Sequence, residues 1–357
     1  MISNSVDIIF ICLLKKHLYI DVIFIILKFF CTNINNDNIH EAVKLYESNQ
    51  SKAILIYGLI EYWKTNKVTN MSKLFMNFHI NFNVNLWNVS NVTDMSKMFY
   101  NAESFNQSLD EWDTSNVQNM NSMFYNARSF NQPLDKWNVS NVQNMRFMFS
   151  DAETFNQSLN NWNTSNVKNM NKMFCGAQSF NQSLDNWNVS NVVDMSEMFA
   201  YAESFNQLLD NWNVSNVTNM SWMFCNAKSF NQPLNNWNMS NVQNMQFMFY
   251  GAKSFNQSLN KWNTSSVTNI NSMFHDAESF NQSLDNWNVS NVQNMSLMFC
   301  SAKSFNQPLD KWNVSNVIDM SSMFANAESF NQPLNDWNVE NVHNMNYMFS
   351  CAKSFNQ

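Results

Sequence analysis

The sequence predicts a repeat solenoid, a coil that completes one turn every 25 residues, and three observations support this fold class. Trp recurs at every 25th position from Trp87 to Trp337 without an insertion. The positions between these Trp residues also keep their types, so that Val92, Met98 and Phe99 have identical equivalents in all eleven copies. The apolar positions are mostly three residues apart, whereas a long amphipathic helix needs alternating steps of three and four.

Each 25-residue unit reads W-N-V-S-N-V-x-N-M-x-x-M-F-x-x-A-x-S-F-N-Q-x-L-x-x. One such turn cannot bury its apolar face alone, so we expect each turn to be stabilised by stacking on its neighbours. We predict one short parallel β-strand per turn, over residues 104–109 and their equivalents. We predict a helical or 3-10 turn on the opposite side, over residues 92–99.

The recurrent asparagines have a structural interpretation. Asn88, Asn91 and Asn106 recur in nearly every turn of the coil. Stacked Asn side chains form hydrogen-bonded ladders and satisfy backbone groups at turns. Asn also tolerates left-handed backbone conformations, which would explain how a turn-rich chain manages with three Gly.

The repeat extends upstream in an irregular form, which is typical of a cap. We expect residues 34–62 to form an N-terminal cap, with a short helix near 38–47 and a strand leading into the first turn. Ile56 and Ile60 suggest this strand, because they precede Trp63 at the spacing seen in the regular turns. Residues 63–357 then form the solenoid, with one decayed repeat followed by regular repeats and no cap at the C-terminal end.

Residues 1–33 form an interrupted hydrophobic segment. The apolar run from Ile8 to Leu14 is broken by Lys15 and Lys16. A membrane span needs about 20 apolar residues with few charges, and a signal peptide needs a basic start and a small-residue cleavage site. Three interpretations remain open: a degenerate signal or membrane anchor through residues 6–31, a buried capping helix, and a mis-assigned start.

Two motifs of the repeat, W-[ND]-[VT]-S-N-V-x-[ND]-M-x-x-M-F and A-x-S-F-N-Q-x-L-x-x-W, closely resemble the BspA-like leucine-rich-repeat surface proteins. They are most similar to the 25-residue version found in mycoplasmas. The resemblance covers about residues 63–357. It implies a right-handed, leucine-rich-repeat-like coil that is secreted or displayed at the cell surface for adhesion or protein binding. The chain departs from this family in lacking a clear secretion signal and a flanking anchor domain.

Composition and motifs exclude several classes of function. The net charge is −7 and no run of Lys or Arg occurs, which argues against a nucleic-acid partner. Of the five His, His17 and His40 are N-terminal, His79 lies in the decayed repeat, and His275 and His343 lie at different positions of the repeat, so no catalytic arrangement can be proposed and we expect no enzymatic activity. No CxxC or zinc spacing occurs among the six cysteines, which we interpret as free thiols. We expect no cofactor and no metal, because the recurrent Met residues lie at core spacing.

The positions at which the repeats differ carry the candidate site. Residues 25 apart are here said to share a register, which is named after its first regular member. The Lys97 register is polar in several turns but contains large apolar residues in five others. If it is exposed, these residues form an interaction strip along one side of the rod, since exposed apolar strips mark binding surfaces. The alternative is that the register is half-buried and accommodates a side chain of any size. The candidate strip consists of Phe147, Trp222, Phe247, Leu297 and Tyr347.

A second variable register alternates in charge over its last four members, which are Glu278, Lys303, Glu328 and Lys353. We expect neighbours in this register to form exposed ion pairs that help to align the stack. Taken together, these patterns predict a non-enzymatic scaffold that binds an unidentified protein or glycan partner. The alternative is a structural protein that assembles end to end through its last, uncapped turn.

Overall fold

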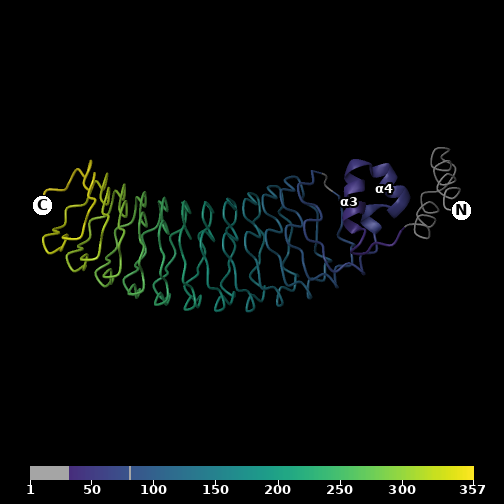
Figure 1. The fold of residues 1–357 in the computed structure, drawn as a ribbon, viewed down its shortest axis with the longest axis horizontal. Helices are drawn as coiled ribbons and strands as arrows, with labels where there is room; N and C mark the ends of the chain where they lie inside the picture. The colour runs from purple at the N-terminus through teal and green to yellow at the C-terminus, as the bar shows by residue number, and fades with distance from the viewer. Residues whose placement is uncertain (1–31, 80–81) are drawn as a thin grey trace.

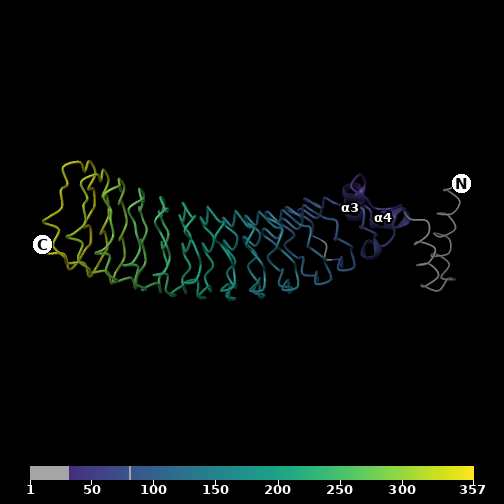
Figure 2. The same cartoon turned by 90° about the horizontal axis from the view of Figure 1, so that it is seen from below.

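The computed structural model describes residues 32–79 and 82–357. Within them the chain forms an elongated, gently bent stack of turns with a helical region at one end and the C-terminus at the other (Figures 1 and 2). Each 25-residue turn is called a rung below. The expectations for residues 6–31 lie outside the described residues. None of the helices within 32–79 and 82–357 has the length and apolar content needed to cross a bilayer.

The helical region contains α3 (Ile39–Ser48), α4 (Gln50–Tyr57) and the 3-10 helix η1 (Ile60–Tyr62). Helix α3 forms because Ile39, Ala42, Val43 and Tyr46 are spaced by three or four residues and are all buried. It occupies nearly the segment in which a short helix was expected.

The strand predicted to lead into the first rung does not form. Residues up to Tyr57 instead belong to α4, whose first turn is capped because the Asn49 side chain accepts a hydrogen bond from the Lys52 backbone N–H (3.0 Å). Helix α4 ends at Gly58, which has a φ of 80° and thereby turns the chain out of the helix. Local helix capping therefore overrides the spacing of Ile56 and Ile60.

The strand predicted over residues 104–109 is also wrong. The described residues contain no named strand, and the rungs are joined by single-residue parallel bridges from Asn70–Asp94 to Asp319–Asn344. Backbone hydrogen bonds between rungs run along the other side of the unit. They join the Met95 N–H to the Asn119 carbonyl (3.0 Å) and continue at residues 97, 99 and 101.

The helical or 3-10 turn predicted over residues 92–99 is replaced by a succession of tight turns. The N–H groups of Met98, Tyr100 and Ala102 each donate to the carbonyl three residues earlier, at 3.1–3.2 Å. Every rung has a positive φ at the Lys97 and Asn101 registers, which interrupts any helix. These turns direct alternate N–H groups along the stack, so the next rung satisfies them.

Stacked apolar side chains fill the inside of the coil. Met98 and Phe99 are fully buried, in agreement with the assignment of the Met registers to the core. The rings of Phe99 and Phe124, in successive rungs, lie 5.5 Å apart and are nearly parallel at 4°. Each regular rung also places its Phe105-register ring about 4 Å from its Phe99-register ring, as Phe99 and Phe105 do at 4.1 Å.

The Trp residues connect each rung to its predecessor. The Trp137 indole N–H donates to the Leu109 carbonyl at 2.9 Å, and the same bond over 28 residues recurs up to Trp337 and Leu309. This bond satisfies the buried indole donor and gives the Leu109 carbonyl, which also accepts from the Trp112 backbone N–H at 3.3 Å, a second hydrogen bond. The indole is therefore a cross-link between turns as well as an apolar filler.

The asparagines confirm the predicted structural role. The Asn106 side-chain oxygen accepts hydrogen bonds from the Asn131 N–H (3.0 Å) and from Gln132 (2.9 Å), so a ladder runs from rung to rung. The Asn88 side chain accepts from the Ser90 N–H at 3.0 Å and closes a local turn. The three recurrent Asn registers do not, however, hold the left-handed positions, which fall at the Lys97 and Asn101 registers.

Candidate interaction surface

The predicted strip lies on the tight turns of the coil, at a left-handed backbone position. Its five members have φ between 57° and 60°. Phe147, Trp222, Phe247 and Leu297 are half-buried, and Tyr347 in the last rung is 76% exposed. A bulky side chain at positive φ is strained, because its Cβ approaches the following carbonyl oxygen.

The five side chains do not form one continuous strip. Only Trp222 and Phe247 stack on each other, with ring centroids 4.0 Å apart and planes 14° from parallel. Between Phe147 and Trp222 the register is occupied by an ion pair, in which Lys172 Nζ lies 3.0 Å from Glu197 Oε2. Serines separate Phe247 from Leu297 and Leu297 from Tyr347.

A neighbouring register enlarges the Trp222–Phe247 pair. The Tyr250 ring lies 5.9 Å from Phe247 and 6.4 Å from Trp222, and the His275 ring lies 4.7 Å from Tyr250 in an edge arrangement. We call these four residues the Trp222 cluster. Tyr250 and His275 were not among the residues predicted for the strip. Each lies three residues after the strip register in its rung, and this spacing was the feature of the sequence that could have identified them.

His275 is the titratable group of the Trp222 cluster. Burial lowers the pKa of its imidazole, and the nearby Asp276 carboxylate opposes this effect. Nε2 lies 3.6 Å from Asp276 Oδ2, while Nδ1 is buried without a hydrogen-bond partner in the described part of the chain. The neutral imidazole is therefore favoured, and the cluster is predominantly aromatic and uncharged.

A second aromatic group surrounds Phe147. Tyr100 and Tyr125 stack with centroids 4.5 Å apart, and Tyr125 meets Phe147 edge to face at 6.0 Å. The Arg146 guanidinium carbon lies 4.8 Å and Lys172 Nζ lies 5.2 Å from the centroid of the Phe147 ring. We call these five residues the Phe147 cluster. It differs from the Trp222 cluster because it combines aromatic rings with cations, which attract each other through the ring quadrupole.

Two cysteines on the same flank, Cys175 and Cys225, are unreactive because of their environment. The four cysteines in the described residues are free, as expected from the sequence. Burial raises the pKa of the Cys175 and Cys225 thiols to about 12. A nucleophilic or metal-binding cysteine needs a thiolate, so these two are inert at neutral pH. Residues 32–79 and 82–357 contain no group of three or more His, Cys, Asp and Glu that could hold a metal.

The alternating charge register forms the ion pairs that were expected. Lys303 Nζ lies 3.2 Å from Glu278 Oε2, and Lys353 Nζ lies 3.0 Å from Glu328 Oε1. Lys253 also pairs with Glu278, at 2.9 Å. The side chains are 34–70% exposed, so each pair contributes only about 0.2–1 kcal/mol. This register aligns and solvates the stack.

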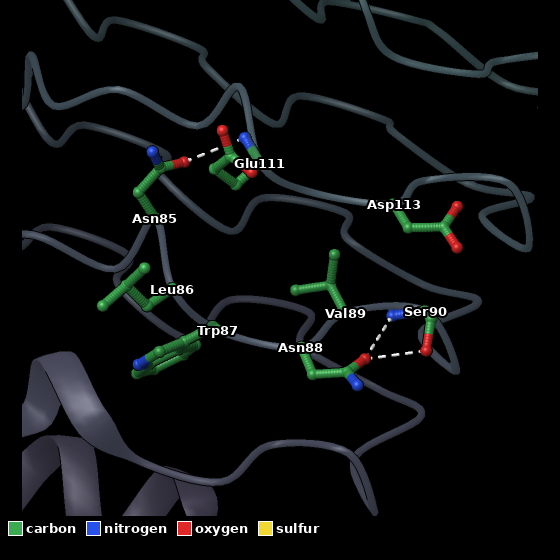
Figure 3. A pocket seen from close by; sticks show the side chains of 8 residues that line it. All are labelled: Asn85, Leu86, Trp87, Asn88, Val89, Ser90, Glu111 and Asp113. Atoms are coloured by element: carbon green, nitrogen blue, oxygen red, sulfur yellow. Dashed lines mark hydrogen bonds between the residues drawn. The ribbon is translucent and has the colours of Figure 1, made fainter.

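A shallow hollow of about 630 Å³ lies near the helical end and is lined by residues 85–90 with Glu111 and Asp113. Figure 3 shows the two carboxylates on the rung beyond Leu86, which is 65% exposed. The hydroxyl of Ser90 donates to the Asn88 side chain at 2.7 Å rather than to a base. The Ser90 hydroxyl is therefore not held by a general base in this hollow.

These features define the class of the molecule as a repeat protein made of stacked 25-residue rungs. More particularly, the chain belongs to the family described as "Mycoplasma protein of unknown function, DUF285", which matches residues 37–162, 148–262, 234–325 and 255–357. The overlapping matches cover the rungs and most of the helical region. No match is found among curated proteins.

Proposed function

We propose that the chain is a non-enzymatic repeat scaffold that binds a protein or glycan partner through the flank formed by its tight turns. As a binding scaffold the chain would resemble the BspA-like surface proteins. The proposal therefore includes a cell-surface or secreted location. It also includes a right-handed coil of the leucine-rich-repeat-like class. The family match and the repeated rungs support a scaffold. The binding role rests on the clusters of the flank.

The observation that carries the proposal is the occupation of a strained position by large rings. Ser122, Ser272 and Ser322 occupy the same register as Trp222 and Phe247, so the fold does not require a ring there. A bulky residue in the left-handed conformation costs about 1–2 kcal/mol. Half-buried aromatic side chains on such a surface are typical anchors of binding interfaces.

The test is the double variant Trp222→Ser with Phe247→Ser in the full-length chain. The chain is assayed against a glycan array and a panel of immobilised extracellular proteins, with urea unfolding measured in parallel. We expect the unchanged chain to bind at least one probe and the double variant to bind it at least about tenfold more weakly, which corresponds to about 1.4 kcal/mol. Leu297→Ser is the matched control, because it empties the same register outside the clusters.

Two outcomes would contradict the proposal. If the double variant loses several kcal/mol of stability, the two rings are core residues and their register is not a binding surface. If the unchanged chain binds no probe, the scaffold has no partner of the proposed kinds. The alternative of end-to-end assembly is distinguished by light scattering after size exclusion, because a monodisperse monomer excludes it.

A further inference from the structure

We infer that the Phe147 cluster is a binding site for the anionic group of an acidic saccharide, with Arg146 as the recognition residue. This inference rests on the proposed binding function and specifies one of its ligands. The site spans four successive rungs, from Tyr100 to Lys172, on the flank described above. Its partner would be a carboxylate or sulfate carried on a sugar ring.

Arg146 is held in position while its outer edge stays accessible. Its Nε–H donates to the Asn171 side-chain oxygen at 2.9 Å, and its guanidinium carbon lies 4.8 Å from the Phe147 ring centroid. Asn171 is 6% exposed and is itself fixed by donating to the Ser196 carbonyl at 3.1 Å. The two Nη groups of Arg146 have no partner within the described residues. A planar fork held in this way is suited to a carboxylate or a sulfate.

The charges around Arg146 leave a local cationic excess in an otherwise acidic chain. Lys97, 5.8 Å from the Tyr100 ring centroid, has no ion-pair partner in the described part of the chain. Lys172 is balanced by Glu197, and the Asp151 carboxylate lies near Tyr125. The three cations Lys97, Arg146 and Lys172 exceed the two carboxylates by one charge, which matches one anionic group.

Other features favour a saccharide over a peptide or a nucleic acid. Cations lie over the Phe147 ring, whereas the core of a protein interface is depleted of charged residues. The stacked Tyr100 and Tyr125 rings add a flat aromatic face with polar hydroxyl groups, against which a sugar ring can pack. A nucleic acid needs many phosphate contacts, and a chain of net charge −7 would repel it.

The chain provides a closely matched control, because it has two arginines. Arg128 also donates its Nε–H to an Asn side chain, that of Asn126, at 2.9 Å. Its Nη1, however, lies 3.6 Å from Glu153 Oε1, so its fork is already occupied by the protein. Arg128→Gln and Arg146→Gln make the same change of side chain and net charge. Gln246 occupies the Arg146 position four repeats later on, so the fold tolerates glutamine there.

The experiment is titration calorimetry of the full-length chain with a chondroitin sulfate hexasaccharide. Neutral maltohexaose, a ten-residue oligothymidylate and a glutamate-rich hexapeptide serve as comparison ligands. We expect the acidic hexasaccharide to bind more tightly than all three. Arg146→Gln should weaken this binding by about tenfold or more, Arg146→Lys by less, and Arg128→Gln by less than about twofold.

The inference is overturned if the unchanged chain does not bind the acidic hexasaccharide, or if both Gln variants weaken binding equally. Tighter binding of the oligothymidylate or of the peptide would assign the cluster to another class of ligand and would also overturn it. If the hexasaccharide does not bind, but another probe binds and Trp222→Ser weakens that binding, only this inference is overturned and the proposed function stands. If nothing binds, the proposed function falls with it.

Discussion

Trp187→Phe tests whether the indole cross-links hold the rungs together. The Trp187 N–H donates to the Leu159 carbonyl at 2.9 Å, and its ring lies parallel to the Trp rings of both adjacent rungs, at 6.3 and 6.4 Å. Replacing the indole by a phenyl ring removes this hydrogen bond and leaves the Leu159 carbonyl with only the Trp162 backbone N–H (3.1 Å), which costs about 0.5–1.5 kcal/mol. The smaller ring also leaves a partial cavity, so we expect a total loss of about 2–4 kcal/mol.

The assay is urea unfolding followed by circular dichroism, combined with hydrogen exchange mapped by mass spectrometry. Trp337→Phe is the control, since Trp337 makes the same bond, to Leu309 at 2.9 Å, in the last rung. In a stack in which each rung is stabilised by its neighbours, Trp187→Phe should speed amide hydrogen exchange in the rungs on both sides of it. Trp337→Phe should speed exchange only in the rungs near the C-terminal end. A loss below about 1 kcal/mol at Trp187, or equal effects of the two variants, would refute the reasoning.

Two further predictions concern the flank. Gly176→Ala should destabilise the chain by about 1–2 kcal/mol, because Gly176 has a φ of +71° and an added Cβ would lie 2.3 Å from Asp151 Oδ1. An unchanged midpoint of thermal unfolding would contradict this prediction. Cys225 should resist iodoacetamide at pH 8.5 while exposed Cys351 reacts, and equal labelling rates in peptide maps would contradict the burial of the thiol. Because burial raises the folded pKa of Cys225 to about 12, its contribution to stability is complete below the unfolded pKa of about 8.5 and is lost as the pH rises towards 12.

The repeat period and the core were predictable from the sequence because stacking forces the same residue types to recur. Val92, Met98 and Phe99 are invariant among the eleven copies, and all three are fully buried. Comparison within one chain therefore separated the residues that hold the coil from those that vary on its surface. The short helix could also be predicted, because its apolar residues follow a helical spacing.

The backbone path of each rung could not be predicted in the same way. The strand was placed at residues 104–109, but most backbone hydrogen bonds between rungs lie at residues 93–101, and only the first position of the predicted strand takes part, as in the bond from the Ser129 N–H to the Glu103 carbonyl. The decisive feature is the positive φ at the Lys97 and Asn101 registers. Lys, Glu, Phe and Trp occupy the first of these registers, and none of them signals a left-handed residue.

The candidate strip was predicted in part. Its register was found because large residues replace small ones, but the half-burial of its members and the gaps between them depend on the tight turns. Tyr250 and Arg146 were missed because their contacts with Phe247 and Phe147 arise from neighbouring positions of a turn that was expected to be helical.

The indole bond that reaches back 28 residues has a consequence for how the molecule can change in length. Each rung completes the one before it and leaves an identical acceptor for the one after it, as Trp137 and Trp162 do with Leu109 and Leu134. Duplication or deletion of one whole 25-residue unit therefore preserves every donor–acceptor pair at the junction, whereas a shift by a single residue breaks them all. Recombination that adds or removes whole units between the two aromatic clusters would alter their separation in fixed steps and leave each cluster intact, which makes that separation a heritable variable of the fold.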